Sequence, residues 1–196
     1  MDRTTRPLVI VGAFAGSLVV GLVLMLWAMG GLRQATAPAA IGGPFQLTDQ
    51  TGQAITEKSM LGRPTLVFFG FTHCPDVCPT TLFEMSEVLR AMGKDADGVN
   101  AYYISVDPER DTQSAMKDYL SSFDPRLKGL TGNSEQVSKV LSEYRVYAKK
   151  VPLKDGDYTM DHTALVYLMD RDGKFVSPFN LNRKPEEAAS DLKRYL

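Results

Sequence analysis

The chain has 196 residues, with 22 Lys plus Arg against 23 Asp plus Glu, a formal net charge of −1 and only two cysteines. This length fits one domain with a short appendage, and 44% hydrophobic residues exclude a disordered chain. The balanced charge argues against a nucleic acid partner, and two cysteines are too few for a disulfide-rich scaffold or a four-cysteine zinc site.

The first predicted element is an apolar helix at residues 8–32, which contains no charged residue. Such a helix is about 37 Å long, enough to cross a hydrocarbon core of roughly 30 Å. A cleavable signal peptide is the alternative, because the Ala-Thr-Ala of residues 35–37 resembles a cleavage site. The apolar region of a signal peptide is usually only about 7–15 residues long, so we expect a transmembrane anchor in contact with membrane lipid.

The charges beside this helix predict its orientation. Arg3 and Arg6 precede it, whereas Arg33 is the only basic residue that closely follows it. The positive-inside rule therefore places residues 1–7 in the cytoplasm. We expect a single-pass protein of the bacterial inner membrane whose main domain is exported to the periplasm.

Residues 33–44, rich in Ala, Gly and Pro, are predicted to form a flexible tether, and residues 45–196 form the globular domain. The domain opens with a short strand at residues 45–47 and a turn at 49–52, and the continuous apolar run at 64–71 is typical of a strand buried on both faces. Spacing and capping residues predict the remaining elements in order: a helix around residues 82–92, a strand at 101–106, a helix from Asp111 or Thr112 to Phe123, a helix opened by Ser134 and reaching Tyr144, a hairpin of strands 163–169 and 174–179, and a helix from Pro185 to Leu196.

This order of elements is that of a thioredoxin-like α/β domain. Strands separated by helices are expected to pair in parallel, and the terminal hairpin is antiparallel. The sequence therefore predicts a mixed central sheet flanked by helices.

Both cysteines, Cys74 and Cys78, lie in the segment FGFTHCPDVCPTT at residues 69–81, where a buried strand ends and a helix begins. The amides and the dipole of a helix N-terminus stabilise a thiolate. A structural disulfide is a poor explanation, because so short a loop removes little entropy from the unfolded chain. A thioredoxin dithiol has two residues between its cysteines and this pair has three, which favours a metal site over a purely redox-active pair.

Two sulfurs and one imidazole suit Cu(I). His73 is expected to be a solvated loop residue. His162 precedes the strand at 163–169, and in a thioredoxin-like fold the preceding loop runs beside the active cysteines; packing at the start of a strand is the alternative. Met160 lies two residues before His162, so it is the one methionine kept as a candidate soft sulfur neighbour of the metal.

Three blocks of sequence carry a family resemblance: FGFTHCPDVCPTTL at residues 69–82, YISVDPERDT at 103–112, and Asp161-His162-Thr163 before a strand that ends in Asp-Arg-Asp-Gly at 170–173. Together they resemble the SCO/SenC family of copper chaperones for cytochrome c oxidase. The resemblance covers residues 45–196.

This resemblance implies one copper ion, Cu(I) or Cu(II), held by Cys74, Cys78 and His162. It also implies delivery of copper to the dinuclear copper site of cytochrome c oxidase subunit II, with other copper chaperones or thioredoxin-like reductants as further partners. Asp161 is a candidate supporting or docking acid, with an exposed turn residue as the alternative. Residues 107–111 are interpreted as a structural Arg–Asp pair at a strand end.

The protein is thus expected to act mainly as a metallochaperone. A thiol–disulfide reductase acting on the subunit II cysteines is the main alternative, with Cys74 and Cys78 as its catalytic redox dithiol and no need for His162. A peroxiredoxin-like peroxidase is the second alternative, because residues 71–72 and 77–80 are similar to a peroxidatic loop. A purely structural or interaction protein is the third.

Overall fold

The computed structural model describes residues 16–27, 40–154 and 156–196. The chain divides into two compact units, Met1–Ala39 and Ala40–Leu196. In the first unit, residues 16–27 are helical and their apolar side chains are exposed. No helix within the described ranges is long and apolar enough to cross a membrane, and the rest of the predicted anchor, at residues 8–15 and 28–32, lies outside those ranges.

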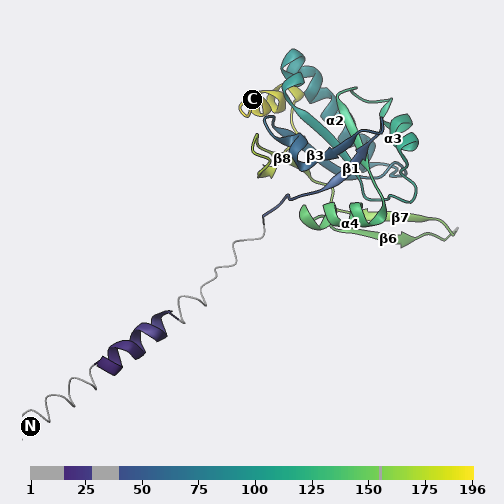
Figure 1. Ribbon diagram of the computed structural model, residues 1–196. Helices are drawn as coiled ribbons and strands as arrows, with labels where there is room; N and C mark the ends of the chain where they lie inside the picture. Colours follow the sequence, from purple (N-terminus) through teal and green to yellow (C-terminus); the bar gives the residue numbers. More distant parts are fainter. Residues whose placement is uncertain (1–15, 28–39, 155) are drawn as a thin grey trace, which may run out of the picture. The chain divides into compact units, whose positions relative to one another are not determined.

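The second unit is built on a seven-stranded sheet with the order β2-β1-β5-β4-β3-β8-β9 (Figure 1). β3 pairs with β4 and β4 with β5 in parallel, whereas β8 is antiparallel to both β3 and β9. The predicted mixed sheet and antiparallel terminal hairpin are therefore confirmed. The strands are β1 (Gln46–Asp49), β2 (Ala54–Thr56), β3 (Thr65–Gly70), β4 (Asn100–Ser105), β5 (Leu127–Thr131), β8 (Val166–Met169) and β9 (Phe175–Pro178).

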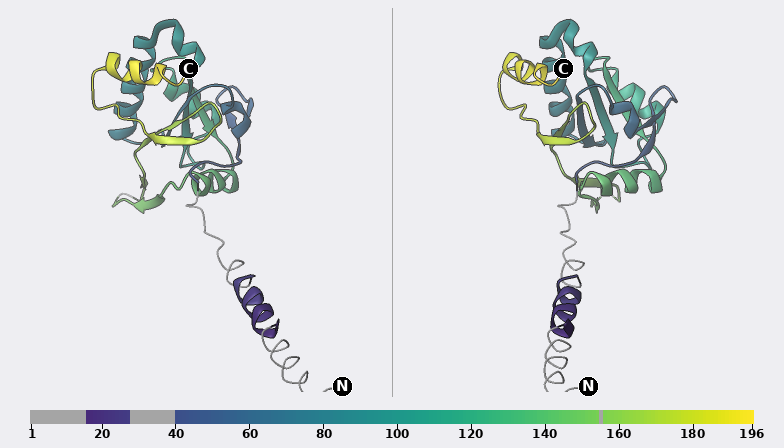
Figure 2. Two further views of the ribbon diagram at one scale, coloured as in Figure 1. Left: turned by 90° about the vertical axis from the view of Figure 1, so that its left-hand side faces the viewer. Right: turned by 60° about the vertical axis from the view of Figure 1, so that its left-hand side comes forward.

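Helices flank this sheet, and α2 and α5 pack against each other (Figure 2). Thr112 caps α3 by accepting a hydrogen bond from the amide of Ala115, and Pro185 is the first residue of α5, as predicted. The helices are α2 (Val77–Met92), α3 (Gln113–Leu120), α4 (Ser134–Glu143) and α5 (Pro185–Lys193), with two 3-10 segments, η1 (Glu57–Met60) and η2 (Gly93–Gly98).

Three helix ends differ from the prediction. α3 ends at Leu120 rather than at Phe123, and the amide of its C-cap, Ser121, bonds to the carbonyls of Lys117 and Asp118. α4 ends at Glu143, so that Tyr144 is its C-cap, and α5 ends before Leu196.

The sequence analysis missed four strands, the first of which is the short β2 that pairs with β1. β5 was missed because Lys128 and Gly129 interrupt its apolar pattern. β6 (Ala148–Pro152) and β7 (Tyr158–His162) form a separate antiparallel ribbon, and none of their residues is fully buried. His162 is therefore the last residue of a strand, not a loop residue as expected, and this ribbon positions it.

Candidate metal centre

The cysteine loop begins where β3 ends, and a buried carboxylate fixes its first residues. Asp111 accepts hydrogen bonds from the amide of Thr72, at 3.2 Å, from its hydroxyl, at 2.7 Å, and from the hydroxyl of Ser105, at 2.6 Å. Because Ser105 is the last residue of β4, these bonds tie the loop to the carboxyl end of the neighbouring parallel strand. The loop is thus a fixed support for the two cysteines.

Cys78 lies in the first turn of α2 and is fully buried, and Cys74 is 8% exposed. Neither is in a disulfide. The amide of Cys78 donates a hydrogen bond to the sulfur of Cys74, at 3.3 Å. The sulfur therefore takes the place of a capping oxygen for one of the free amides of this helix end.

His162 reaches the cysteines from the end of β7. Its Nε2 lies 3.6 Å from the sulfur of Cys78, and its Nδ1 lies 3.0 Å from the carbonyl oxygen of Thr163. A carbonyl oxygen only accepts, so Nδ1 carries the hydrogen and donates it, and Nε2 is the ring nitrogen that faces the sulfurs as the candidate ligand atom. The rings of Phe68 and Phe71 pack edge-on against the imidazole and hold its orientation.

The three side chains form one group of donors. The ligand atoms of Cys74, Cys78 and His162 all lie within 4.8 Å of one another. Two soft sulfurs and one imidazole nitrogen match the ligands that Cu(I) prefers, so this group can hold one copper ion.

Burial disfavours charge at the deeper sulfur. Desolvation raises the pKa of the Cys78 thiol to about 12, and the neighbouring Cys74 adds to the effect. As a free thiol Cys78 is a poor nucleophile at neutral pH, whereas a bound cation stabilises its thiolate directly. The electrostatics therefore suit a metal ligand better than an attacking thiol.

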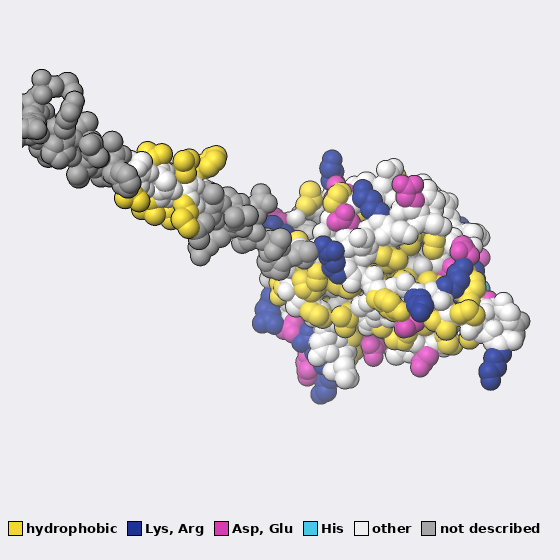
Figure 3. Space-filling view, turned by 90° about the horizontal axis from the view of Figure 1, so that it is seen from below, with side chains coloured by type: hydrophobic (Ala, Val, Ile, Leu, Met, Phe, Trp, Pro, Cys, Tyr) yellow, Lys and Arg dark blue, Asp and Glu magenta, His cyan; other side chains and the backbone are white. Residues whose placement is uncertain are grey.

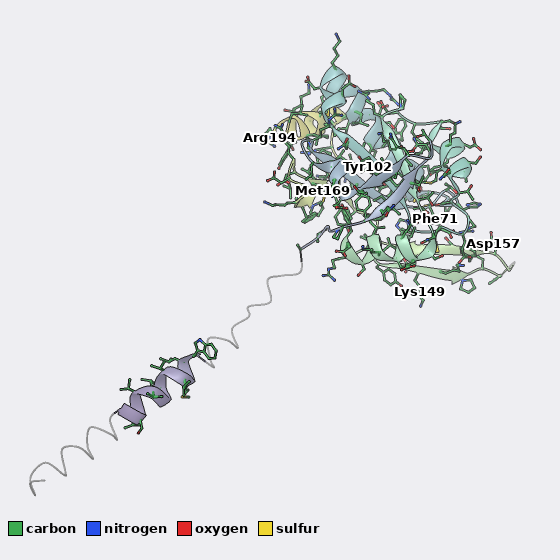
Figure 4. The ribbon with its side chains drawn as sticks, viewed as in Figure 1. Phe71, Tyr102, Lys149, Asp157, Met169 and Arg194 are labelled. Atoms are coloured by element: carbon green, nitrogen blue, oxygen red, sulfur yellow. The ribbon has the colours of Figure 1, made fainter. Side chains whose placement is uncertain are left out.

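The ribbon that carries His162 is attached to the domain through Arg110. The guanidinium of Arg110 pairs with Asp107 at 2.6 Å, donates to the carbonyl of Tyr158 at 2.9 Å, and lies 3.7 Å from the centre of the Tyr158 ring. The Tyr158 hydroxyl donates to the other oxygen of Asp107. The expected Arg–Asp pair is present, and it also fixes the ribbon beside Phe71, whose ring centre lies 5.8 Å from the guanidinium. Figure 4 labels Phe71 together with Lys149 of β6.

An open pocket of about 280 Å³ leads to the site from solvent. Met160 is partly buried and Asp161 is exposed, and both line this pocket, whereas His73 is an exposed loop residue hydrogen-bonded to Thr72. The pocket is lined by Phe71, Cys74, Pro75, Asp76, Val77, Thr159, Met160, Asp161 and His162. On the face shown in Figure 3, hydrophobic side chains lie between scattered charges of both signs, so no single-sign field covers it.

The comparison with protein families agrees with this geometry. The SCO1/SenC family model matches residues 33–196. The chain belongs to the SCO1/SenC family. Among solved SCO structures, Bradyrhizobium japonicum ScoI with copper bound is 77% identical, with a TM-score of 0.79, and the match covers 80% of this chain and 100% of that one.

More distant relatives match a similar share of the chain. Yeast Sco1 with copper bound is 36% identical, with a TM-score of 0.72, and the match covers 80% of this chain and 88% of that one. The human mitochondrial SCO1 homolog is 42% identical over 159 residues, which are 80% of this chain and 53% of the human protein. The match thus spans about half the length of the human relative.

Sequence reasoning did not single out two residues that border the site. Gly70 and Tyr103 lie on neighbouring strands, and a Cβ atom added to Gly70 would contact both Cys78 and Tyr103. A glycine that ends a continuous apolar strand was the available signal for a close approach.

Proposed function

We propose that this protein is a copper chaperone that binds one copper ion through Cys74, Cys78 and His162 and delivers it to the dinuclear copper site of cytochrome c oxidase subunit II. The observation that carries the proposal is the meeting of three donor atoms within 4.8 Å, although His162 lies 84 residues from Cys78. Membership of a family that includes copper-bound ScoI and Sco1 supports the choice of metal.

The donors act as follows. The two thiols lose their protons as copper binds, so copper affinity increases with pH. The imidazole of His162 supplies the third donor through Nε2. Three donors leave a coordination position through which a thiolate of the partner can enter, and copper then transfers by stepwise exchange of ligands.

The cellular setting is also proposed. Residues 1–7 lie in the cytoplasm, residues 8–32 anchor the protein in the bacterial inner membrane, residues 33–44 form the tether and residues 45–196 form the periplasmic domain. The helical, exposed and apolar residues 16–27 support the anchor. Other copper chaperones or thioredoxin-like reductants are the proposed upstream partners.

Asp161 is proposed as a docking acid. It is exposed, lines the open pocket and is adjacent to His162 in β7. A partner that approaches the metal through this pocket passes this carboxylate, so Asp161 can pair with a basic side chain of that partner.

The test is an anaerobic Cu(I) titration in competition with a chromogenic chelator. We expect His162→Ala to keep the wild-type far-UV circular dichroism and to bind Cu(I) more than about 100-fold more weakly, because loss of a residue that only supports a metal ligand already costs about 10–100-fold. His73→Ala, which removes the other histidine of the chain, is the matched control and is expected to bind like the wild type. Equal affinities for His162→Ala and the wild type would refute the carrier function.

The same variants separate the rival activities. A thiol–disulfide reductase would reduce a disulfide peptide from subunit II as fast with His162→Ala as with the wild type. A peroxiredoxin-like peroxidase would consume hydrogen peroxide in the presence of a thiol reductant and without copper.

A further inference from the structure

Tyr103 carries a hydroxyl group that the fold leaves without a partner. The residue is fully buried in β4, and its hydroxyl makes no hydrogen bond to any part of the chain that the structure describes. Leaving a polar group unsatisfied inside a protein costs free energy, so most buried hydroxyls have a partner. This hydroxyl therefore calls for an explanation.

The position of the hydroxyl is set by its neighbours. The Tyr103 ring stacks on Phe68, with centroids 5.8 Å apart, and tilts against Tyr119, with centroids 5.9 Å apart. A Cβ atom built on Gly70 would lie 2.8 Å from the Tyr103 hydroxyl and 2.7 Å from the sulfur of Cys78. The hydroxyl and the sulfur thus border the same small space, which exists because residue 70 has no side chain.

We propose that Tyr103 is a positioning residue for the copper site, whose hydroxyl donates a hydrogen bond to the sulfur of Cys78 when that sulfur is a metal-bound thiolate. The proposal rests on the copper-binding function proposed above. A thiol is a weak acceptor, which explains why the hydroxyl is unpartnered beside a neutral Cys78. A thiolate is a strong acceptor, and a charge-assisted bond is about twice as strong as a neutral one.

Two consequences follow for the bound metal. First, the hydroxyl gains its partner only when copper binds, so its contribution adds to copper affinity. Second, a hydrogen bond to a metal-bound sulfur withdraws electron density from it, which raises the reduction potential of the metal and the energy of sulfur-to-copper charge transfer.

Tyr103→Phe tests the proposal because it removes the hydroxyl and keeps the ring. The variant is expected to unfold at the same or a higher temperature than the wild type before copper is added, because it no longer buries an unsatisfied group. It is also expected to bind Cu(I) roughly 10- to 100-fold more weakly. The charge-transfer band of its Cu(II) form should move to lower energy.

Tyr119→Phe is the matched control, because Tyr119 carries another buried hydroxyl without a recorded partner and lies one ring farther along the same stack. We expect it to bind Cu(I) within about twofold of the wild type and to keep the wild-type band. Unchanged affinity and an unmoved band in Tyr103→Phe, or equal changes in both variants, would overturn the proposal.

Nuclear magnetic resonance of the Cu(I)-loaded wild type gives a test that needs no variant. The hydroxyl proton of Tyr103 is expected to move downfield and to exchange more slowly with solvent after Cu(I) is added, and no change would also overturn the proposal. A failure confined to Tyr103 leaves the carrier function in place, whereas wild-type protein that binds no copper, or binds it independently of His162, refutes the carrier function itself.

Discussion

Gly70→Ala is expected to damage both the fold and the copper site, because the new methyl group has no room. Its Cβ atom would lie 2.7 Å from the sulfur of Cys78, 2.7 Å from Cε2 of Tyr103 and 2.8 Å from the Tyr103 hydroxyl. Cys78 and Tyr103 are both fully buried, so neither can swing into solvent. One of them, or the end of β3, must shift.

The size of the effect comes from two opposing terms. Overpacking of a close-packed core costs about 1–3 kcal/mol. Replacing glycine by alanine restricts the unfolded chain, and this stabilises the folded protein by about 0.4–1 kcal/mol where the native backbone is compatible with alanine. The central values, about 2 and about 0.7 kcal/mol, leave a loss of about 1.3 kcal/mol. At about 2–4 °C per kcal/mol for a domain of this size, the unfolding temperature falls by about 3–5 °C.

The assay combines thermal unfolding with anaerobic Cu(I) titration. Gly129→Ala in β5 is the matched control, since its Cβ would lie 2.6 Å from Cδ1 of Leu120 and 2.8 Å from Cε of Met116, the flexible ends of two side chains. We expect a smaller stability loss there and wild-type copper affinity. If Gly70→Ala unfolds at or above the wild-type temperature and binds Cu(I) normally, the packing argument is wrong.

Two further predictions concern side chains outside the donor group. Arg110→Ala is expected to speed amide exchange around Tyr158 and to weaken Cu(I) binding by about tenfold, because it removes the ion pair with Asp107 and also the hydrogen bond and the cation–π contact that hold Tyr158. Lys150→Ala should have less effect, and equal behaviour of the two variants would contradict this role. Burial would raise the pKa of the Asp124 carboxyl, but hydrogen bonds from Arg126 outweigh burial and lower this pKa. The contribution of the Asp124 carboxylate to stability is therefore complete above about pH 4, and it is lost as the pH falls through the folded-state pKa. In urea unfolding Asp124→Asn should therefore lose roughly 2 kcal/mol at pH 7. The loss should become smaller as the pH falls below about 4, and a loss that does not change with pH would contradict the predicted direction.

The sequence predicted those elements whose pattern is set by burial. β3 is buried at every residue, and its unbroken apolar run is unambiguous. Capping residues predicted the starts of α3 and α4, because local hydrogen bonds at Thr112 and Asn133 fix them. These signals are local in the chain and need no knowledge of the tertiary fold.

The ribbon of β6 and β7 could not be predicted in this way. Neither strand alternates buried and exposed residues, and its attachment depends on Arg110, which lies 48 residues before Tyr158. The sequence identified His162 through its place before the next strand and through the family resemblance. It did not indicate that a separate ribbon holds the ring, nor that Tyr103 lies beside the sulfur of Cys78.

The difference in burial between the donors has a consequence for the order in which bonds to a bound ion break. Cys74 and His162 line the open pocket, whereas Cys78 is fully buried and does not line it. A competing ligand from solvent therefore reaches the ion from the side of Cys74 and His162. Under the proposed carrier function, Cys78 would therefore be the last of the three ligands to release the ion, after the acceptor has replaced the other two.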